Sequence, residues 1–367
     1  MAIDATALLG PRTGVGVFTF ELLSHLPGCG VDPLAYATSW RGRGRLADVV
    51  PPGVQVSSRP QAARPLRELW RRFDRPPIEW WTGEIDVVHG PNYVVPPARH
   101  APGLVTIHDL TFHHHPEMST TDTLQYPGLI ARALRRGAWV HTESEFVAGE
   151  ICDRYRVDPE RVVVVPLGVS ALPEADPARG HDLAGGERYL LALGTVEPRK
   201  DLPLLVDAFD LIAAEDPEIR LVIAGPHGWG ADELTERIER SPHRDRVVRL
   251  GWVSDSDRSA LLRGARVLAY PSRYEGFGLP PLEAMSVGTP VVATAVGALP
   301  EVLGDAARLV DTGDAAALAG AISELVDQGP PRDELIGRGR RRAERYSWPA
   351  CAEGMADLYR HLAGADR

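Results

Sequence analysis

The sequence is poor in cysteine, has no long apolar run and carries no basic excess, and each shortage excludes a class of protein. Its three cysteines, Cys29, Cys152 and Cys351, are too few and too scattered for a disulfide framework or a metal-ligand spacing. The sequence contains no run of about 18 apolar residues, which would predict a membrane span. It also contains no basic region followed by an apolar segment, which would predict a signal peptide. The formal net charge is −10, whereas a nucleic-acid partner requires a basic surface. We therefore expect a cytosolic protein without a polynucleotide partner, in which a few local cations could still bind a small anion.

Length and strand pattern predict two α/β domains. The chain has 367 residues, 44% of them hydrophobic, which suits two domains of ordinary size. Continuous apolar strands that alternate with amphipathic stretches are typical of parallel sheets covered by helices on both faces. The predicted strands fall into two series, Ile3–Ala5, Val87–His89, Leu104–Ile107, Val140–Thr142 and Val162–Pro166, then Tyr189–Leu193, Leu221–Ala224, Val247–Leu250, Val267–Tyr270 and Val291–Thr294.

A segment rich in Pro, Asp, Ala and Gly, Ala171–Glu187, separates the two series and is interpreted as a linker. We expect an N-terminal doubly wound domain over residues 1–170, a second one over 188–345, and a terminal segment over 346–367. Ligands of such sheets bind beyond the carboxyl ends of the strands, so two facing domains would form a binding cleft.

The strongest candidate site is Ser272–Gly288, directly after the predicted strand Val267–Tyr270. Gly276 and Gly278 allow the backbone to approach a ligand closely. Pro280 and Pro281 suit the first turn of a helix, whose N-terminus attracts anions. The sequence therefore predicts a phosphate-binding turn here.

Two carboxylates flank this turn. Glu275 and Glu283 could accept hydrogen bonds from paired sugar hydroxyls. The alternatives are a solvated loop residue for Glu275 and compensation of the helix dipole for Glu283. Their shared glycine-rich setting favours ligand binding.

A basic pair follows the predicted strand Tyr189–Leu193. Arg199 can grip phosphate oxygens bidentately, and Lys200 adds a compact point charge. Preorganised cations of this kind stabilise a departing nucleoside diphosphate. The alternative is an exposed basic pair before a helix.

The N-terminal half offers two weaker candidates. Gly14 and Gly16, in the turn Thr13–Val17, could cradle a phosphate or merely form a tight turn; Thr19 replaces the third glycine of the dinucleotide-binding fingerprint. His108, after the strand Leu104–Ile107, could donate to a sugar hydroxyl or phosphate, or be a structural histidine.

Two patterns suggest metal sites only superficially. The adjacent side chains of His113–His115 cannot easily converge on one ion. Asp255 and Asp257 form a D-x-D pattern, but capping of the following helix by Ser254 or Asp255 explains them better. No metal site is predicted.

The segment Arg64–Trp81 mixes arginine and tryptophan and could contact a membrane surface. We favour instead a short amphipathic helix that covers the sheet, with Leu66, Leu69, Trp70 and Phe73 directed inward.

Nearly the whole chain resembles the retaining GT-B glycosyltransferases of family 4, a group that includes bacterial mannosyltransferases. The resemblance is carried, in family order, by TGVGVF, HGPNYVVP, TIHDLT, TESEF, VVPLGV, LGTVEPRKDL, LVIAG, LGWVSDSDRSALL, AYPSRYEGFGLPPLEAMSVGTPVVA and ALPEV. It implies two facing Rossmann-like domains, an N-terminal one on the acceptor side and a C-terminal one that binds the nucleotide sugar, with Tyr346–Ala363 crossing back to the N-terminal one.

The resemblance also implies residue roles. Glu275 would bind the donor sugar's hydroxyls and Glu283 the ribose hydroxyls, while Arg199 and Lys200 would hold the diphosphate. His108 would lie beside the donor sugar and phosphate. Backbone N–H groups of Gly276, Phe277, Gly278 and Leu279 would contact the sugar and phosphates. Gly14 and Gly16 would approach the diphosphate from the other domain. The nucleobase would lie at Gly251–Val253, including Val253.

The implied reaction moves a hexose, with mannose favoured, from a nucleotide-diphosphate sugar to a hydroxyl of a glycan or glycolipid. The resemblance further implies retained anomeric configuration and no metal or other cofactor, with peripheral contact at the inner membrane face as one option. The alternatives are a related epimerase or phosphorylase and a catalytically silent nucleotide-sugar-binding protein.

Overall fold

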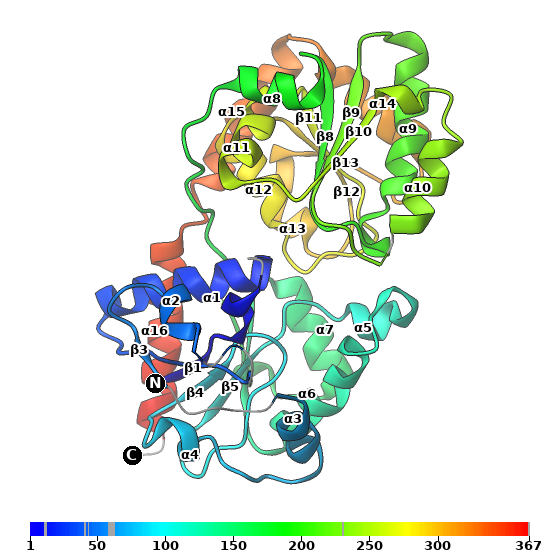
Figure 1. Cartoon of the computed structure of the whole chain (residues 1–367). Coiled ribbons are helices and arrows are strands. Elements are labelled where there is room, and N and C mark those ends of the chain that lie inside the picture. The colour runs from blue at the N-terminus through cyan, green and yellow to red at the C-terminus, as the bar shows by residue number, and fades with distance from the viewer. Residues whose placement is uncertain (11–12, 40–41, 43, 58–62, 230, 366–367) are drawn as a thin grey trace. The chain divides into compact units, whose positions relative to one another are not determined.

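The computed structural model describes residues 1–10, 13–39, 42, 44–57, 63–229 and 231–365. The chain forms two compact units (Figure 1). Unit 1 comprises Met1–Gly168 and Ser347–Arg367, and unit 2 comprises Val169–Tyr346. Among the described helices, none is long and apolar enough to span a bilayer.

Unit 1 is built on a parallel sheet of seven strands in the order β3-β2-β1-β4-β5-β6-β7. The strands are β1 (Ala2–Asp4), β2 (Leu34–Tyr36), β3 (Gln55–Val56), β4 (Val88–Gly90), β5 (Gly103–Thr106), β6 (Trp139–Thr142) and β7 (Val162–Val164). Five of them were expected from the apolar runs, and β2 and β3 were not.

Helices cover the sheet of unit 1. They are α1 (Gly14–His25), α2 (Leu46–Val49), α3 (Ala63–Arg72), α4 (Glu79–Thr82), α5 (Thr111–His114), α6 (Tyr126–Arg135), α7 (Glu145–Tyr155) and α16 (Trp348–Ala365), with single 3-10 turns at Thr6–Leu9, Leu26–Cys29, Pro116–Met118, Thr123–Gln125 and Pro159–Arg161. Val88, Val105 and Val140 belong to one core cluster with residues of α6 and α7. The alternate strand residues face α1 and α16, so α16 completes the core of unit 1 although unit 2 precedes it in the chain.

A hydrogen-bonded chain of buried polar groups runs under α16. Tyr359 Oη lies 2.8 Å from His89 Nδ1, His89 Nε2 lies 2.7 Å from Thr106 Oγ1, and Thr106 Oγ1 lies 3.0 Å from His141 Nδ1. His141 Nε2 lies 3.0 Å from the carbonyl of Val165, so it carries the hydrogen. Burial lowers the pKa of both histidines, so both rings are neutral. The neutral His141 then accepts at Nδ1, which sets the direction of every bond: Thr106 donates to His141, His89 to Thr106, and Tyr359 to His89.

Unit 2 is built on a parallel sheet of six strands in the order β10-β9-β8-β11-β12-β13. The strands are β8 (Tyr189–Leu193), β9 (Arg220–Ala224), β10 (Val247–Gly251), β11 (Val267–Tyr270), β12 (Val291–Thr294) and β13 (Arg308–Val310). The first five match the expected runs to within a residue.

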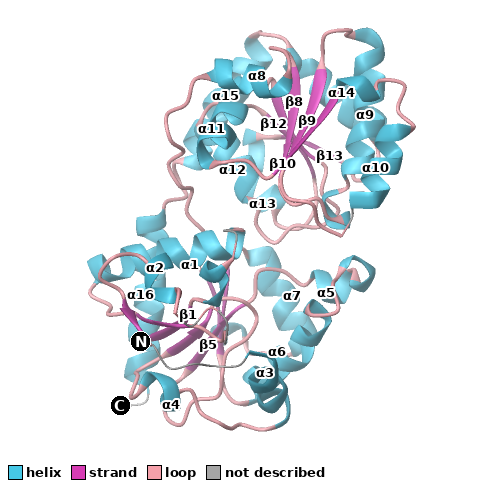
Figure 2. Ribbon diagram, in the orientation of Figure 1, coloured by secondary structure: helices cyan, strands magenta, loops and turns pink. Residues whose placement is uncertain are grey.

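Helices flank both faces of this second sheet (Figures 1 and 2). Helices α9, α10 and α14 lie on one face, and α8, α11, α12 and α15 on the other. Their bounds are α8 (Pro177–Ala184), α9 (Leu202–Glu215), α10 (Ala231–Glu239), α11 (Asp255–Gly264), α12 (Leu279–Ser286), α13 (Leu299–Leu303), α14 (Ala315–Val326) and α15 (Pro330–Ala343), with 3-10 turns η6 (Pro198–Lys200), Arg244–Arg246 and Gly304–Ala306.

The structure modifies two expectations about connecting segments. The expected linker Ala171–Glu187 contains α8, which begins at an Asp176 cap and packs on α11. On α3, Leu66 and Trp70 are buried as expected, but Leu69 is 42% exposed, because a helix presents one stripe to the core and this side chain lies outside it. Phe73, which follows the last residue of α3, is 59% exposed.

Both sheets reverse strand order beside their first strand. In unit 1 the order runs outward from β1 through β2 and β3, and then resumes on the other side at β4. In unit 2 the same reversal lies between β8 and β11. Doubly wound sheets bind ligands at such switch points, because the loops diverge there and leave a crevice.

Candidate active site

The switch point of unit 2 carries the residues that the sequence singled out most strongly. Beyond β8 the chain forms η6, which holds Arg199 and Lys200, and beyond β11 it forms the loop that holds Glu275. A pocket between the two loops is lined by Gly194, Lys200 and Tyr270, among others. Residues from two distant segments thus meet because their strands are neighbours.

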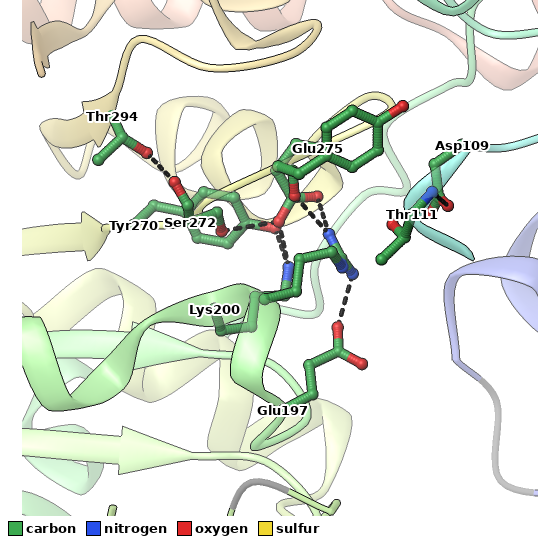
Figure 3. Close-up of polar contacts among 10 residues, drawn as sticks. Asp109, Thr111, Glu197, Lys200, Tyr270, Ser272, Glu275 and Thr294 are labelled. Atoms are coloured by element: carbon green, nitrogen blue, oxygen red, sulfur yellow. Dashed lines mark hydrogen bonds and ion pairs between the residues drawn. The ribbon is translucent and has the colours of Figure 1, made fainter. Parts of the chain in front are cut away.

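Glu275 is the centre of this cluster (Figure 3). Its Oε1 lies 2.6 Å from Lys200 Nζ, and its Oε2 lies 2.7 Å from Arg199 Nη1. Arg199 also reaches Glu197 at 2.6 Å and donates to the carbonyl of Tyr274. One carboxylate therefore accepts from two cations, and only 5% of its residue surface is exposed.

Lys200 is the single lysine of the sequence, which has 40 basic residues in all. Its ammonium also donates to Tyr270 Oη and lies 4.4 Å from the centroid of that ring. A guanidinium is broader and planar, so it cannot replace a compact ammonium in this narrow space. A chain that uses arginine everywhere else has a lysine where the geometry requires one.

Neighbouring hydroxyls and backbone groups fix Glu275. Ser272 Oγ donates to Glu275 Oε1 at 2.7 Å, and Thr294 Oγ1 donates to the carbonyl of Ser272 at 2.5 Å. The amide of Ala298 donates to the carbonyl of Glu275 at 2.9 Å. A Cβ on Gly297 would lie 2.2 Å from that carbonyl oxygen, so this approach requires glycine.

Burial and pairing shift the pKa values of the cluster. Burial alone would raise the pKa of Glu275, but Arg199 and Lys200 outweigh it and lower that pKa to about 2. Burial lowers the pKa of Lys200 even though Glu275 opposes the shift. Burial also raises the pKa of Tyr270 well above its usual value. The carboxylate is thus ionised at neutral pH.

The loop before α12 supplies fewer helix amides than expected. The helix begins at Leu279 after Gly278, whose φ of 103° suits glycine. Pro280 and Pro281 occupy the next two positions, so only Leu279 among these three carries an N–H group. An anion at this end would depend on the amides of Gly276, Phe277, Gly278 and Leu279 more than on the first helical turn.

Glu283 lies one turn into α12 and is 5% exposed. It forms an ion pair with Arg258 of α11. Burial raises the pKa of Glu283, and the Arg258 guanidinium only partly offsets that shift. Neither dipole compensation nor solvation explains a buried paired carboxylate, and Arg258 is a partner that the sequence did not reveal.

The expected nucleobase segment, Gly251–Val253, begins at the last residue of β10, the outermost strand on one side of the sheet. Trp252 is 66% exposed there. Ser254 caps α11, since its side chain accepts from the amide of Asp257, which confirms the capping interpretation of the D-x-D pattern. Within the described residues, no group of three or more His, Cys, Asp or Glu could hold a metal ion.

In unit 1, His108 follows β5 and has both ring nitrogens engaged. Nδ1 lies 2.5 Å from Glu143 Oε1, and Nε2 lies 2.8 Å from the carbonyl of Pro91. Both partners are acceptors, so the ring satisfies them only when it carries both hydrogens. Burial opposes the charged form, but Glu143 and then Pro91 raise the pKa of His108 above its usual value. Glu143 lies in the TESEF segment and had no predicted role.

The glycines of the N-terminal turn differ from expectation. Helix α1 begins at Gly14, so Gly14 and Gly16 belong to the helix and not to a turn before it. Gly14 is exposed at the first helical position, whereas Gly16 is buried. Of the two, only Gly14 is therefore open to a ligand.

The three adjacent histidines are dispersed. His113 Nε2 bonds to Tyr155, while His114 pairs with Glu150 and His115 with Glu117.

Of the residues predicted for the site, the structure brings together Arg199, Lys200 and Glu275, and it adds Tyr270 and Ser272 from the same strand end. The only sequence signal for Tyr270 and Ser272 is that they lie at, or just beyond, the carboxyl end of a central strand.

The two halves of the chain match different models of one enzyme group. Residues 12–171 match the model described as Glycosyltransferase Family 4, and residues 177–342 match the one described as Glycosyl transferases group 1. O-antigen chain mannosyltransferase B of Escherichia coli is 33% identical over 284 residues, which cover 75% of this chain and 74% of that protein.

Other relatives align over a smaller share. MMP alpha-(1->4)-mannosyltransferase of Mycolicibacterium hassiacum is 35% identical over 59% of this chain and 53% of its own length. D-inositol 3-phosphate glycosyltransferase of Salinispora arenicola is 36% identical over 65% of this chain and 57% of its own length.

Among solved structures, WaaG, a glycosyltransferase involved in lipopolysaccharide biosynthesis, gives a TM-score of 0.76 at 17% identity, covering 98% of this chain and 99% of that one. Anabaena HepE, in complex with UDP and glucose, gives 0.75 at 18% identity, covering 98% and 100%. Fold, sequence and family models agree, and the chain belongs to the glycosyltransferases of family 4, with the GT-B fold.

Proposed function

We propose that this glycosyltransferase moves a hexose, with mannose favoured, from a nucleotide-diphosphate sugar to a hydroxyl of a glycan or glycolipid. The proposal includes retention of anomeric configuration and no metal requirement. The observation that carries it is the convergence of Arg199 and Lys200 on Glu275 at the switch point of unit 2.

The comparisons support the choice of sugar and donor. Two relatives at 33% and 35% identity are named mannosyltransferases. HepE, which shares the fold, was solved with UDP and glucose, and this favours a nucleotide-sugar donor for the present chain as well.

The proposed mechanism uses the two cations as the electrostatic partner of the leaving group. Negative charge grows on the diphosphate as its bond to the sugar breaks, and preorganised Arg199 and Lys200 stabilise that charge without reorganisation. Glu275 would hold the sugar hydroxyls, and Glu283 the ribose. The acceptor hydroxyl attacks from the face that the diphosphate leaves and gives its proton to the departing phosphate oxygen, so no protein base is assigned.

The proposed contact of His108 with the donor sugar or phosphate requires the ring to release the Pro91 carbonyl, because both N–H groups are engaged and Glu143 balances the charge of the imidazolium. Glu143 positions this ring, since it holds Nδ1.

A thermal-shift screen of GDP, UDP and ADP tests the donor site. A ligand at about 100 times its Kd adds about 2.7 kcal/mol of stability, which is easily measured. We expect one nucleoside diphosphate to raise the Tm, and Lys200→Ala to abolish the shift. A control at an exposed cation, Arg240→Ala, should keep it. A full response from Lys200→Ala would refute the assignment.

Metal independence and stereochemistry have separate tests. Transfer should persist in excess EDTA, and loss of activity that Mg²⁺ restores would contradict the role given to the two cations. NMR of the initial product should show the donor's anomeric configuration.

A further inference from the structure

The segment Arg199–Asp201, which carries the two cations, is held in place by one residue of the loop after β11. The amide of Arg273 donates to the carbonyl of Arg199 at 2.8 Å. The guanidinium of Arg273 donates to both oxygens of Asp201: Nε lies 2.8 Å from Oδ2, and Nη2 lies 2.9 Å from Oδ1. Arg273 therefore holds the chain on both sides of Lys200.

The backbone of Asp201 is turned to allow this pairing. Its φ of 46° and ψ of 44° are left-handed, a conformation that Asp and Asn tolerate better than most other L residues. Asp201 occupies the N-cap position of α9, where an aspartate ordinarily accepts a bond from a helix amide, yet its side chain caps none of the amides of α9, all of which are described. A capping residue is usually extended, so the left-handed backbone accounts for a carboxylate that meets Arg273 and not the helix.

The Arg273–Asp201 pair suits a role in orientation more than in stability. The Asp201 side chain is 6% exposed and the Arg273 side chain 43%. A partly exposed pair contributes little to the stability of a domain. Two parallel bonds from a planar guanidinium to one carboxylate, however, constrain direction as well as distance. The pair can thus fix how the segment Arg199–Asp201 lies against the loop after β11.

The orientation of this segment matters because Lys200 has little freedom of its own. Its side chain is 12% exposed, and its ammonium lies between Tyr270 Oη and Glu275 Oε1, 2.6 Å from the latter. A backbone shift of about 1 Å would break that contact, and shifts of this size can lower a rate by about 10²-fold when they displace a group that acts in the transition state.

We propose that Arg273 and Asp201 are positioning residues of the donor site. Their bidentate pair, together with the amide of Arg273, fastens the loop after β8 to the loop after β11 and so holds Arg199 and Lys200 where the leaving diphosphate needs them. The inference rests on the function proposed above. Neither residue is among the donor contacts proposed there.

Hydrogen exchange of the full chain tests the local part of the proposal. Asp201→Asn keeps a residue that tolerates the left-handed backbone but removes the charge, and Arg273→Gln removes the guanidinium. The amides of Lys200 and Asp201, which donate to the carbonyls of Glu197 and Pro198, should exchange several-fold faster in both variants. Mass spectrometry of the peptides that contain Lys200 measures this. If Asp201→Asn fails to fold, Arg273→Gln carries the test.

Donor kinetics test the functional part, with GDP-mannose and UDP-glucose as probes and release of the nucleoside diphosphate as the readout. Both variants should lower kcat by about tenfold and change KM by less than about threefold, because the charge on the diphosphate is larger in the transition state than in the bound donor. Arg273→Lys keeps the charge but not the planar fork, so its kcat should lie between those of the wild type and Arg273→Gln.

Arg188→Gln is the matched control. Arg188 precedes β8, at the opposite edge of the same sheet, and it likewise donates through Nε and Nη2 to one aspartate, Asp216. We expect it to lower the urea midpoint at least as much as Arg273→Gln does, and to leave the exchange at Lys200 and kcat unchanged.

The outcomes are distinct. Unchanged exchange in Asp201→Asn and Arg273→Gln overturns the proposal, and so does faster exchange with an unchanged kcat, because the pair would then be structural only. A fall in kcat that Arg188→Gln shares would indicate general destabilisation and also overturn it. Failure of the proposed function gives another result: the wild type would turn over neither donor and show no thermal shift with GDP, UDP or ADP, while faster exchange at Lys200 would still establish the fastening of the two loops.

Discussion

Lys200 Nζ and Glu275 Oε1 lie 2.6 Å apart although 75 residues separate them in the chain. They meet because β8 and β11 are parallel neighbours, so the segments that follow them emerge at the same edge of the sheet. The pair is neutral as a unit, and this neutrality determines how substitutions at either residue act.

Glu275→Gln should destabilise unit 2 and uncouple donor binding from transfer. Removing one partner of a buried ion pair costs about 3–5 kcal/mol of unfolding free energy, measurable by urea denaturation. The released cations should bind a nucleoside diphosphate at least as tightly as in the wild type, while transfer falls. Glu324→Gln breaks an exposed pair with Arg308 and should cost about 0–1 kcal/mol. Equal losses in the two variants would contradict the buried pairing.

Lys200→Arg should fail to restore activity despite its conserved charge, because the guanidinium does not fit between Tyr270 and Glu275. As the single lysine, Lys200 also provides a chemical test. An amine-selective reagent should modify Lys200 and the α-amino group alone, and a bound nucleoside diphosphate should protect Lys200. Peptide mass spectrometry measures both; labelling of Lys200 that is indifferent to nucleotide would count against its position in the donor site.

Gly297→Ala should displace Glu275, since its Cβ would meet the Glu275 carbonyl oxygen at 2.2 Å. Gly313 has a similar left-handed φ, 76° against 55°, but its Cβ would meet nothing within 4 Å. Gly313→Ala should therefore cost only the backbone strain, about 1–2 kcal/mol. We expect kcat to fall in Gly297→Ala and to stay unchanged in Gly313→Ala, and similar kinetics in both would exclude the steric explanation.

Arg258→Ala should destabilise unit 2 by about 3–5 kcal/mol at neutral pH, because it leaves Glu283 buried without its partner. The pKa of Glu283 is already raised in the folded state, so protonation favours folding and stability falls as pH rises through that pKa. The variant should therefore recover stability as pH is lowered from neutrality, more than the wild type does. Adding Glu283→Gln should restore much of the loss, and a strictly additive double mutant would show that the two residues are not coupled.

Tyr359→Phe should destabilise unit 1 by about 1–3 kcal/mol, because His89 Nδ1 loses its donor. Tyr36→Phe is a matched control: Tyr36 is buried, and its hydroxyl has no partner among the described residues, so its removal should be neutral or stabilising. Urea denaturation of both variants compares them. Equal losses would mean that the bond to His89 contributes nothing.

The same hydrogen-bonded network makes the stability of unit 1 depend on pH. Burial lowers the pKa of His89 well below 6.5 and also lowers that of His141. Below about pH 6.5 the two histidines are protonated in the unfolded chain but stay neutral in the folded chain. They therefore reduce the free energy of unfolding as the pH falls below about 6.5.

The sequence predicted most strands because central parallel strands are continuous apolar runs. It did not predict β2, β3 and β13, which lie toward or at the sheet edges, where runs such as Arg308–Val310 are shorter or half exposed. The helix α8 was obscured by a composition of Pro, Ala, Gly and Asp, although its Asp176 cap and following Pro177 are ordinary helix-start signals.

At the site, residue types beyond strand ends indicated Arg199, Lys200 and Glu275, but not their mutual pairing. Pairings such as Glu283 with Arg258 and His108 with Glu143 depend on how separate elements pack, and neither has a local sequence signal.

Helix α16 completes the core of unit 1, yet the ribosome makes it after all of unit 2. Unit 1 therefore cannot complete its core until α16 is synthesised. Until then, the face that Trp348 and Tyr359 cover in the folded chain stays exposed to solvent. A message truncated just after Tyr346 would encode every residue of the proposed donor site and still yield a polypeptide whose N-terminal half lacks its covering helix. The cell's proteases would recognise such a product by the uncovered core of its N-terminal unit, although only the C-terminal helix is missing.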